Sequence, residues 1–382
     1  MARLPYLLLL TSPLLLAACS EDSVVPTAPA PGAASRSVGV GAAPGAVYTE
    51  TNSASGNYVL VFRRAADGSL TADGSVATGG TGSGAGLGSQ GAVTLSDDGN
   101  WLLVVNAGSN EVSSFAVGPN GALTLRGRAS SGGTHPISVT IHDNLVYALN
   151  DGGNGNIAGL RLGTDGSLTP IAGSSRGLSG SAVAPAQVQI DPTGSWLVVT
   201  EKNTNKIDTW RIGQDGLASG RVINASSGVT PFGFTFTTQG VLAVSEAFAA
   251  APNGSATSTY TINPDGTLHV ISASAPTTET SACWTVATTN GKFVYVTNAV
   301  SGSVTGYASR QGELTRLDPD GKSATTGAGP TDMAIAHNSQ ALYTLNGGAH
   351  TITGFGVSQA AGTLASIGAA AVPAGAVGIA AK

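Results

Sequence analysis

Short apolar runs, five or six residues long, alternate with polar turns along the chain from residue 45 to the end. Residues 185–209, PAQVQIDPTGSWLVVTEKNTNKIDT, show the unit: a strand, a tight turn at DPTG, an apolar strand, a polar bend and a third strand. A further Asp-Gly turn then introduces a fourth strand, QDGLASGRVIN. Four antiparallel strands in about fifty residues are typical of one β-propeller blade.

Two features of this unit recur in phase. The hairpin glycine before the fourth strand recurs at intervals of 53, 45, 50, 50, 46 and 50 residues, as Gly68, Gly121, Gly166, Gly216, Gly266, Gly312 and Gly362. The second strand recurs as AVYTE, WLLVVN, LVYALN, WLVVTE, VLAVSE, FVYVTN and ALYTLN. We therefore predict an all-β fold with very little helix, a single seven-bladed β-propeller of four-stranded antiparallel blades over residues 45–382.

The two ends of the repeat region indicate how the ring closes. The first copy begins at its second strand, GAVYTE, so its innermost strand is missing. The C-terminal PAGAVGIAAK looks like an innermost strand with nothing after it. We expect residues 374–381 to pair with Val47–Glu50 and complete the first blade, which removes an exposed sheet edge.

Charge excludes one class of partner. Charged residues make up 10% of the chain, the net charge is −5, and lysine and arginine form no cluster. Phosphate backbones are bound by such clusters, so we expect no nucleic-acid partner. We expect the protein to be monomeric.

The N-terminus carries a targeting pattern. Arg3 precedes the apolar run LPYLLLLTSPLLL, and LAAC places small residues directly before Cys19. This resembles a bacterial lipoprotein signal, which implies removal of residues 1–18 and lipidation of Cys19. Residues 19–44 are rich in Ala, Pro, Ser and Gly, as expected of a disordered tether. An uncleaved anchor or an ordinary secretory signal is the alternative.

The resemblance also implies a location. Ser20, rather than Asp, follows the cysteine, which favours a lipid anchor in the outer membrane facing the periplasm. We therefore expect a cell-envelope protein that is held to the membrane through Cys19.

The repeat resembles a known family. The second strands, the DPTG turns and the DGSLT hairpins are similar to those of the seven-bladed lactonase propellers, and FVYVTNAVSGSV at 293–304 is the closest local match. That family includes 6-phosphogluconolactonase-like and carboxymuconate-cyclising members, and the surface proteins with a Tyr-Val-Thr-Asn repeat are related to it. The resemblance implies hydrolysis of a sugar-type lactone at the upper mouth of the channel, where first strands begin and second strands end.

Seven aligned residues at the second-strand ends are all Glu or Asn: Glu50, Asn106, Asn150, Glu201, Glu246, Asn298 and Asn346. One interpretation is structural, with each side chain tying down the bend after its strand. The other is that Glu201 and Glu246 face the mouth and act as a catalytic base or as part of a cation site.

The acid–base residues of the family are not matched. Relatives commonly carry a His before the DPTG strand and an Arg-His pair in the next blade, whereas this chain has Ala186, Phe232 and Gly233 there. We predict that the mouth binds its ligand through Gln187, Phe232, Trp284, Asp332, Lys206 and His135. His135 could also take part in acid–base chemistry.

Two functions are therefore open: hydrolysis of a lactone, or non-catalytic binding of a glycan, peptide or protein partner in the envelope. No cofactor and no metal ligand set is predicted, although the carboxylates could hold a divalent cation at the channel mouth. The segment GLGSQG at 86–91 matches G-x-G-x-x-G but leads into a strand, so we expect a flexible loop there rather than a phosphate site.

Overall fold

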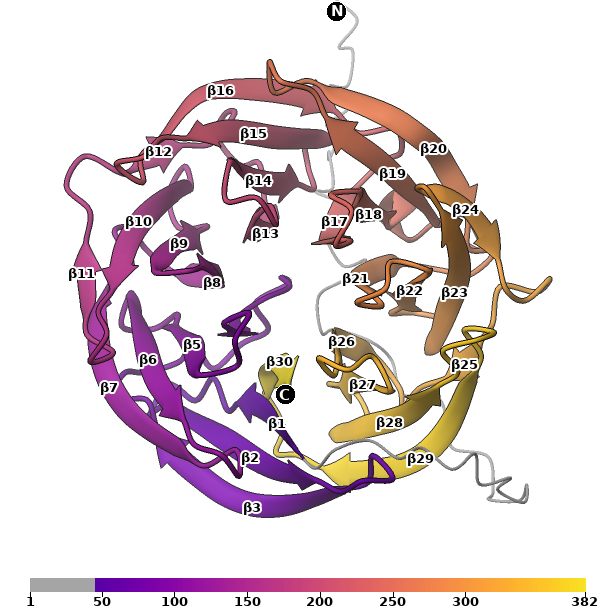
Figure 1. Ribbon diagram of the computed structural model, residues 1–382, viewed down its shortest axis with the longest axis horizontal. Coiled ribbons are helices and arrows are strands. Elements are labelled where there is room, and N and C mark those ends of the chain that lie inside the picture. Colours follow the sequence, from indigo (N-terminus) through magenta and orange to yellow (C-terminus); the bar gives the residue numbers. More distant parts are fainter. Residues whose placement is uncertain (1–44) are drawn as a thin grey trace, which may run out of the picture.

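The strand–turn repeat folds into seven sheets arranged around a central axis (Figure 1). The computed structural model describes residues 45–382, so the expected signal peptide, tether and lipidation site at Cys19 lie outside the described residues. Within 45–382 the predicted seven-bladed, all-β propeller is confirmed. Its one helical turn is a 3₁₀ segment, η2, at Phe248–Ala250.

Each blade runs from an inner strand beside the channel to an outer strand on the rim. The inner strands are β30 (Val377–Ala381), β4 (Val93–Leu95), β8 (Pro136–His142), β13 (Pro185–Ile190), β17 (Pro231–Phe236), β21 (Ala282–Ala287) and β26 (Pro330–Ile335). The second strands are β1 (Gly45–Glu50), β5 (Trp101–Asn106), β9 (Leu145–Asn150), β14 (Trp196–Glu201), β18 (Leu242–Glu246), β22 (Phe293–Asn298) and β27 (Ala341–Asn346).

The outer half of each blade follows the same order. The third strands are β2 (Tyr58–Arg64), β6 (Glu111–Val117), β10 (Asn156–Leu162), β15 (Lys206–Ile212), β19 (Ala256–Ile262), β23 (Ser303–Arg310) and β28 (Thr351–Val357). The outer strands are β3 (Leu70–Ala77), β7 (Leu123–Ser130), β16 (Ala218–Ala225), β20 (Leu268–Pro276) and β29 (Leu364–Ala371). In two blades the outer strand is split, into β11 (Leu168–Pro170) with β12 (Arg176–Gly177), and β24 (Glu313–Arg316) with β25 (Ala324–Thr325).

The ring closes through the C-terminal strand, as predicted. β30 pairs antiparallel with β1, in the register Val47 to Ala381 and Thr49 to Ile379. The Arg64 side chain adds a second tie, because its Nη2 donates to the carbonyl of Lys382 over 2.8 Å. The first blade is therefore built from both ends of the described chain, and no inner sheet edge is left open there.

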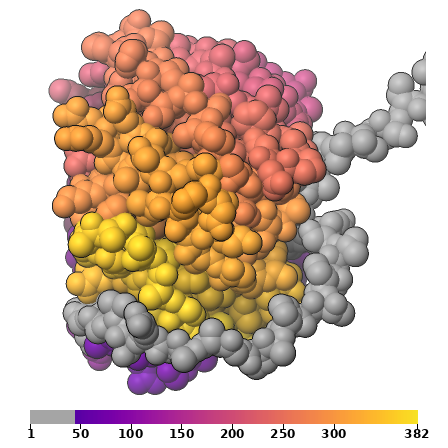
Figure 2. Space-filling model, turned by 90° about the vertical axis from the view of Figure 1, so that its right-hand side faces the viewer, coloured from indigo at the N-terminus to yellow at the C-terminus, as the bar shows by residue number. Residues whose placement is uncertain are grey.

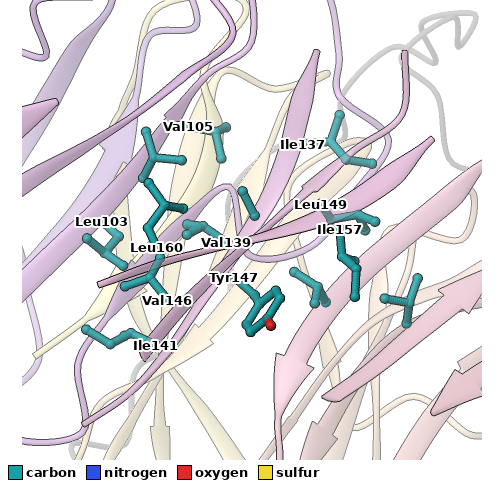
Figure 3. Packing of buried hydrophobic residues seen from close by; sticks show 14 of the residues in the cluster. Leu103, Val105, Ile137, Val139, Ile141, Val146, Tyr147, Leu149, Ile157 and Leu160 are labelled. Carbon is teal, nitrogen blue, oxygen red and sulfur yellow. The ribbon is translucent and has the colours of Figure 1, made fainter. Parts of the chain in front are cut away.

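Apolar side chains fill the spaces between neighbouring sheets. Figure 3 shows part of the largest cluster, where β5, β8, β9 and β10 contribute Leu103, Val105, Ile137, Val139, Ile141, Val146, Tyr147, Leu149, Ile157 and Leu160. Seen from the side, the blades pack into a continuous wall, with the C-terminal half in orange and yellow (Figure 2). Blade-to-blade packing thus supplies the hydrophobic core of the ring.

Every hairpin glycine that marks the repeat also contacts the preceding blade. Its carbonyl accepts a hydrogen bond from a tyrosine of a second strand or from a hydroxyl of a third strand. The seven bonds measure 2.5–2.8 Å and join Tyr48 to Gly121, Ser114 to Gly166, Tyr147 to Gly216, Thr209 to Gly266, Thr259 to Gly312, Tyr295 to Gly362, and Tyr343 to Gly68.

In the part of the chain from residue 45 onward, no helix is long and apolar enough to cross a membrane.

Candidate functional site

The residue that precedes an inner strand on the upper face takes a left-handed backbone conformation in five blades. The φ angles are 56° at His135, 49° at Ala184, 59° at Thr230, 61° at Ser281 and 56° at Gly329. A side-chain amide supports this bend in two of the blades, since the Oδ1 atoms of Asn110 and Asn205 each accept an N–H, from His135 and Thr230 respectively, over 2.7 Å. The repeat therefore fixes the backbone conformation of this residue in five blades, and among these only the third blade has a histidine there.

His135 forms a pair with a carboxylate of the same blade. Its Nδ1 lies 2.5 Å from Oδ1 of Asp151, and both side chains are about one third exposed. This hydrogen bond raises the pKa of His135 above its ordinary value, with a smaller contribution from the charge of Asp151 and against the effect of burial. A histidine oriented by a carboxylate and open to water is an arrangement suited to general-base chemistry.

Lys202 directly follows β14, near enough to Asp151 for the charge of that carboxylate to act on it. Its Nζ donates to the carbonyl of Gly88 over 2.6 Å and lies 4.8 Å from the centre of the Phe232 ring. Burial lowers the pKa of Lys202 to about 8, and the charge of Asp151 acts in the opposite direction. The upper end of the channel thus combines a His–Asp pair with a partly buried ammonium group.

Lys202 was not among the residues predicted to bind a ligand, whereas Lys206 was, and that role of Lys206 stays a prediction. Lys206 is half-buried at the start of β15, where it pairs with Glu201 in the ladder. A signal for Lys202 was present, because it follows the last residue of a second strand and must therefore lie on the upper face.

A segment between the first two blades crosses the channel just below this face and bonds to the fourth and sixth blades. The Gln90 amide donates to the carbonyl of Thr285 over 2.8 Å and accepts the N–H of Thr285 over 3.0 Å. The indole of Trp284 donates to the carbonyl of Ser89 over 2.8 Å, and the Gln90 N–H donates to the carbonyl of Ala186 over 3.1 Å. We call residues 86–91 the plug; Figure 1 shows the chain before β5 reaching into the centre of the ring.

Residues 86–91 do form a loop, with no helix or strand, but this loop is held by hydrogen bonds across the channel, and that fixation was not predicted. Sequence spacing could not reveal it, because the partners of Gln90 and Ser89 lie 195 residues away, in the sixth blade. Hydrogen bonds across the channel replace the local secondary structure that this glycine-rich segment lacks.

The plug also explains the residues that depart from the family pattern. Phe232 and Trp284 meet edge to face, with ring centres 5.3 Å apart, and both are buried. A Cβ atom on Gly233 would lie 2.0 Å from Oε1 of Gln90 and 2.6 Å from the carbonyl oxygen of Cys283. Positions expected to carry acid–base residues instead make room for the plug and support it.

Below the plug, the channel contains a cavity of about 550 Å³, here called the lower cavity. Its lining runs from Gln90 to the turns between first and second strands, so it opens on the face opposite His135. Gln187 lines it, but its amide is already bound to the N–H and carbonyl of Phe234, over 2.7 and 2.9 Å. Gln187 therefore links the fourth and fifth inner strands.

Asp332 also lines the lower cavity and links inner strands. Its two carboxylate oxygens accept the N–H groups of Met333 over 2.7 Å and of Ile379 over 3.2 Å, so it joins the seventh blade to the closing strand. Burial is the main reason that the pKa of Asp332 rises to about 8. The structure thus brings Gln187 and Asp332 to the lower cavity, and His135, Phe232 and Trp284 to the upper end.

Glu201 lies inside the fourth blade, away from both places. It is fully buried and accepts hydrogen bonds from the Ser179 N–H over 2.8 Å, from the Ser179 hydroxyl and from the Thr204 hydroxyl over 2.6 Å. It is not among the described residues that line the lower cavity. These bonds tie down the bend after β14, as the structural interpretation of this residue predicts.

Glu246 is held in the same way in the fifth blade. It accepts hydrogen bonds from the Gly228 N–H over 2.7 Å, the Ser258 hydroxyl over 2.6 Å and the Ser274 hydroxyl over 2.7 Å. Burial raises the pKa of Glu246, while these hydrogen bonds lower it. A catalytic role for Glu201 and Glu246 stays a prediction, and their enclosure favours the structural interpretation.

The asparagines of the same ring show the structural role directly. Three of the four donate the amide to a hydroxyl on the third strand of their own blade: Asn106 to Ser113 over 2.8 Å, Asn298 to Thr305 over 2.9 Å and Asn346 to Thr353 over 2.9 Å. Asn150 donates instead to the backbone carbonyls of Ser131 and Asn156, over 3.2 and 3.4 Å. These bonds tie the end of one strand to the next.

Among residues 45–382 no three metal-ligating side chains gather, and the cation at the mouth remains a prediction.

Comparisons with known proteins agree with the fold. The family model described as Lactonase, 7-bladed beta-propeller matches residues 47–183 and 137–378. A search of curated proteins finds no match.

Solved structures give the same architecture. A candidate 6-phosphogluconolactonase from Bacteroides uniformis superposes with a TM-score of 0.68 at 19% identity, covering 88% of this chain and 98% of the other. The periplasmic gluconolactonase of Pseudomonas aeruginosa gives a TM-score of 0.70 at 16% identity, also over 88% and 98%. At such identities the likeness concerns the fold alone.

Proposed function

Because the chain belongs to the lactonase family of seven-bladed β-propellers, we propose that it hydrolyses a sugar-type lactone at the upper end of the channel. The observation that carries this proposal is the 2.5 Å contact between His135 and Asp151. The contact occupies Nδ1 of the ring, which leaves Nε2 for a water molecule. Lys202 supplies a positive group beside the pair.

The proposed reaction needs a general base that activates water and a positive group that stabilises the negative charge on the lactone carbonyl oxygen. Neutral His135 takes a proton from water at Nε2 as the water oxygen bonds to the lactone carbonyl carbon. The ring C–O bond then breaks, and the proton returns from His135 to the departing alkoxide oxygen. The Lys202 ammonium stabilises the negative charge that develops on the carbonyl oxygen. The carboxylic acid that forms then loses its proton to water, and Lys202 stabilises the resulting carboxylate.

A second function has its own support. Phe232, Gly233 and Ala186 serve the plug where relatives carry acid–base residues, and this favours a propeller that binds a glycan, peptide or protein partner without turnover. The exposed His–Asp pair weighs toward the enzyme, because a binding surface has no need of a histidine oriented in this way.

For location, we propose a lipid anchor at Cys19 in the cell envelope, facing the periplasm. Its support is the LAAC pattern before Cys19 and the acylated-lipoprotein signal that it resembles. Mass spectrometry of the protein purified from membranes tests this, and an intact Met1–Ala18 segment on that protein would contradict it.

Purified protein should be assayed against a panel of sugar lactones, including glucono-δ-lactone, with proton release as the readout. We expect turnover above the spontaneous rate, and a loss of about 100-fold in His135→Gln, the usual scale for removing a general base. Lys202→Met should also lower kcat, whereas the matched variant Lys292→Met, at an exposed lysine directly before β22 on the opposite face, should leave it unchanged.

Two results would count against the enzyme. A folded wild-type protein that turns over no lactone of the panel favours the binding function, and a His135→Gln variant with wild-type kcat removes the His–Asp pair from the mechanism. The Glu201→Gln/Glu246→Gln double variant tests the other candidate base in the same assay, with its thermal melt as a check on folding.

A further inference from the structure

A crevice of about 480 Å³ lies on the outer rim of the ring, between the third and fourth blades. β12 forms one wall and β16 the other (Figure 1), and Trp210 of β15 lies at its floor. The described residues that line this crevice include neither His135 nor Lys202, and none of them lines the lower cavity. The crevice is therefore separate from the channel and from the proposed lactone site.

Two arginines, one from each wall, reach across the crevice to the opposite blade. Nε of Arg176 donates to the carbonyl of Ala218 over 2.8 Å, and Nη1 of Arg221 donates to the carbonyl of Gly177 over 2.7 Å. Further bonds to backbone carbonyls of the third blade hold both guanidinium groups in place. An anion that binds these groups meets side chains that are already ordered, so little conformational entropy is lost on binding.

The charges of the two arginines are not neutralised in the crevice. Neither arginine forms an ion pair with a carboxylate among residues 45–382, and no acid belongs to the described lining of the crevice. The charge of Arg221 acts on Asp208 inside the fourth blade, although burial raises the pKa of that acid to about 7. The crevice itself is thus a positive site that an anion would neutralise.

Hydrogen-bond donors remain free in the crevice. In the part of the chain that the structure describes, Nη2 of Arg176 and Nη2 of Arg221 have no hydrogen-bond partner, and neither has the indole N–H of Trp210. Gly177 and Gly220 leave room beside these donors, since nothing lies within 4 Å of a Cβ atom on either glycine. A ligand that offers acceptor oxygens would satisfy all three donors.

We propose that this crevice is a second binding site, independent of the lactone site, and that it takes a doubly charged phosphate group. Each guanidinium group bonds to a phosphate oxygen, and the Trp210 N–H bonds to the third. A phosphate monoester has three strong acceptor oxygens and close to one negative charge for each arginine, whereas a carboxylate has two oxygens and one charge. The group can belong to free phosphate or to a phosphate monoester, because Gly177 and Gly220 leave the crevice open to solvent.

Four probes separate charge from shape: methyl phosphate, dimethyl phosphate, inorganic phosphate and acetate, titrated into the wild-type protein at low ionic strength and followed by ligand-observed NMR. At pH 8 methyl phosphate carries two charges, because the second pKa of a phosphate monoester is about 6, and dimethyl phosphate carries one. We expect methyl phosphate to bind at least about fivefold more tightly than dimethyl phosphate or acetate. Equal affinity of methyl phosphate and either singly charged probe overturns the proposal.

Inorganic phosphate identifies the source of the group in the same titration. Inorganic phosphate that binds more tightly than methyl phosphate supports a site for the free ion. The reverse order supports a site for an esterified phosphate.

Variants then locate the site without removing an arginine. Gly177→Asp places a carboxylate in the crevice beside both guanidinium groups and should weaken methyl phosphate binding by about tenfold or more. Gly177→Asn, which has the same size without the charge, should stay within about twofold of the wild type. Wild-type affinity in Gly177→Asp, or equal affinity of the two variants, overturns the proposal.

Removing one charge gives a second test. Arg221→Gln should weaken methyl phosphate binding by about tenfold, whereas Arg310→Gln, at an exposed arginine that ends β23, should leave it unchanged. Thermal melts check folding, because Arg221 also joins two blades. Equal affinity of a folded Arg221→Gln variant and Arg310→Gln places the ligand elsewhere and overturns the proposal.

Discussion

Tyr343 and Gly68 lie 275 residues apart in the sequence, yet the tyrosine hydroxyl donates a 2.7 Å hydrogen bond to the glycine carbonyl. The bond joins the seventh blade to the first, next to the strand that closes the ring. Gly68 has a φ of 86°, which a residue with a side chain rarely adopts, and a Cβ atom there would lie 2.6 Å from Cδ1 of Ile367. The glycine thus fits both the turn and the blade contact.

Removing this hydroxyl should weaken the ring at its closure. In Tyr343→Phe the Gly68 carbonyl stays buried without its donor, and we expect the free energy of unfolding to fall by about 1–2 kcal/mol. Urea unfolding measures this. Tyr58→Phe, on a side chain 44% exposed, is the control and should change stability by less than about 0.5 kcal/mol. Equal stability of both variants would show that the bond contributes nothing.

Deleting residues 374–382 removes β30 and the carbonyl that Arg64 binds. We expect a loss of several kcal/mol, because β1 then becomes an inner edge and buried Ile379 and Val377 are lost from the core. Thermal unfolding and gel filtration would detect lower stability and association through the open edge. A truncated protein that melts with the wild type would mean that β30 does not hold the ring.

The sequence predicted the fold well because its strongest signals are local. A hairpin glycine and an apolar strand recur every blade, and both are fixed by turn geometry and by burial between sheets. The plug was missed because Gln90 finds its partner Thr285 only after the ring has closed. Lys202 was missed for a related reason. Its position directly after a strand places it on the upper face, but the Phe232 ring and the Gly88 carbonyl that it contacts are distant in the sequence.

Gly233→Ala tests the plug. The new Cβ would collide with the Gln90 side chain and the Cys283 carbonyl, so we expect a loss of about 1–3 kcal/mol, the usual cost of overpacking. Amide hydrogen exchange in residues 86–91 should become faster as Gln90 is displaced. Gly177→Ala is the matched control, since nothing lies within 4 Å of a Cβ there. Unchanged exchange in Gly233→Ala would show that the plug does not depend on this glycine.

The pH dependence of lactone hydrolysis follows from two groups at the upper end. His135 must be neutral to accept a proton, and its raised pKa moves the rise in kcat above the pH at which an ordinary histidine would produce it. Lys202 must be charged, and its pKa of about 8 means that activity falls as pH rises further. Initial rates corrected for spontaneous hydrolysis should give a bell-shaped profile. A profile that keeps rising through about pH 9 would remove Lys202 from the mechanism.

Asp208 allows a prediction about stability. It is fully buried beside Glu201, and neither of its carboxylate oxygens has a hydrogen-bond partner among the described residues. Burial, and then the charge of Glu201, raise its pKa to about 7. Ser113, Thr305 and Thr353 occupy the equivalent position in three other blades, where their hydroxyls accept the strand-end amide. In the fourth blade, both the strand-end residue Glu201 and its third-strand neighbour Asp208 carry a carboxyl group.

The sign follows from proton binding. A buried acid with a raised pKa holds its proton in the folded state over a range in which the unfolded chain has lost it, so stability falls as pH rises from about 4 to about 7. Asp208→Asn should remove that part of the pH dependence and copy the first blade, where the Asn57 amide donates to Glu50. We expect the variant to be more stable than the wild type by about 2–4 kcal/mol at pH 8 and to lose that advantage near pH 4. Urea unfolding at both pH values measures this difference in the free energy of unfolding. A difference that is the same at pH 8 and at pH 4 would show that Asp208 does not hold a proton in the folded state.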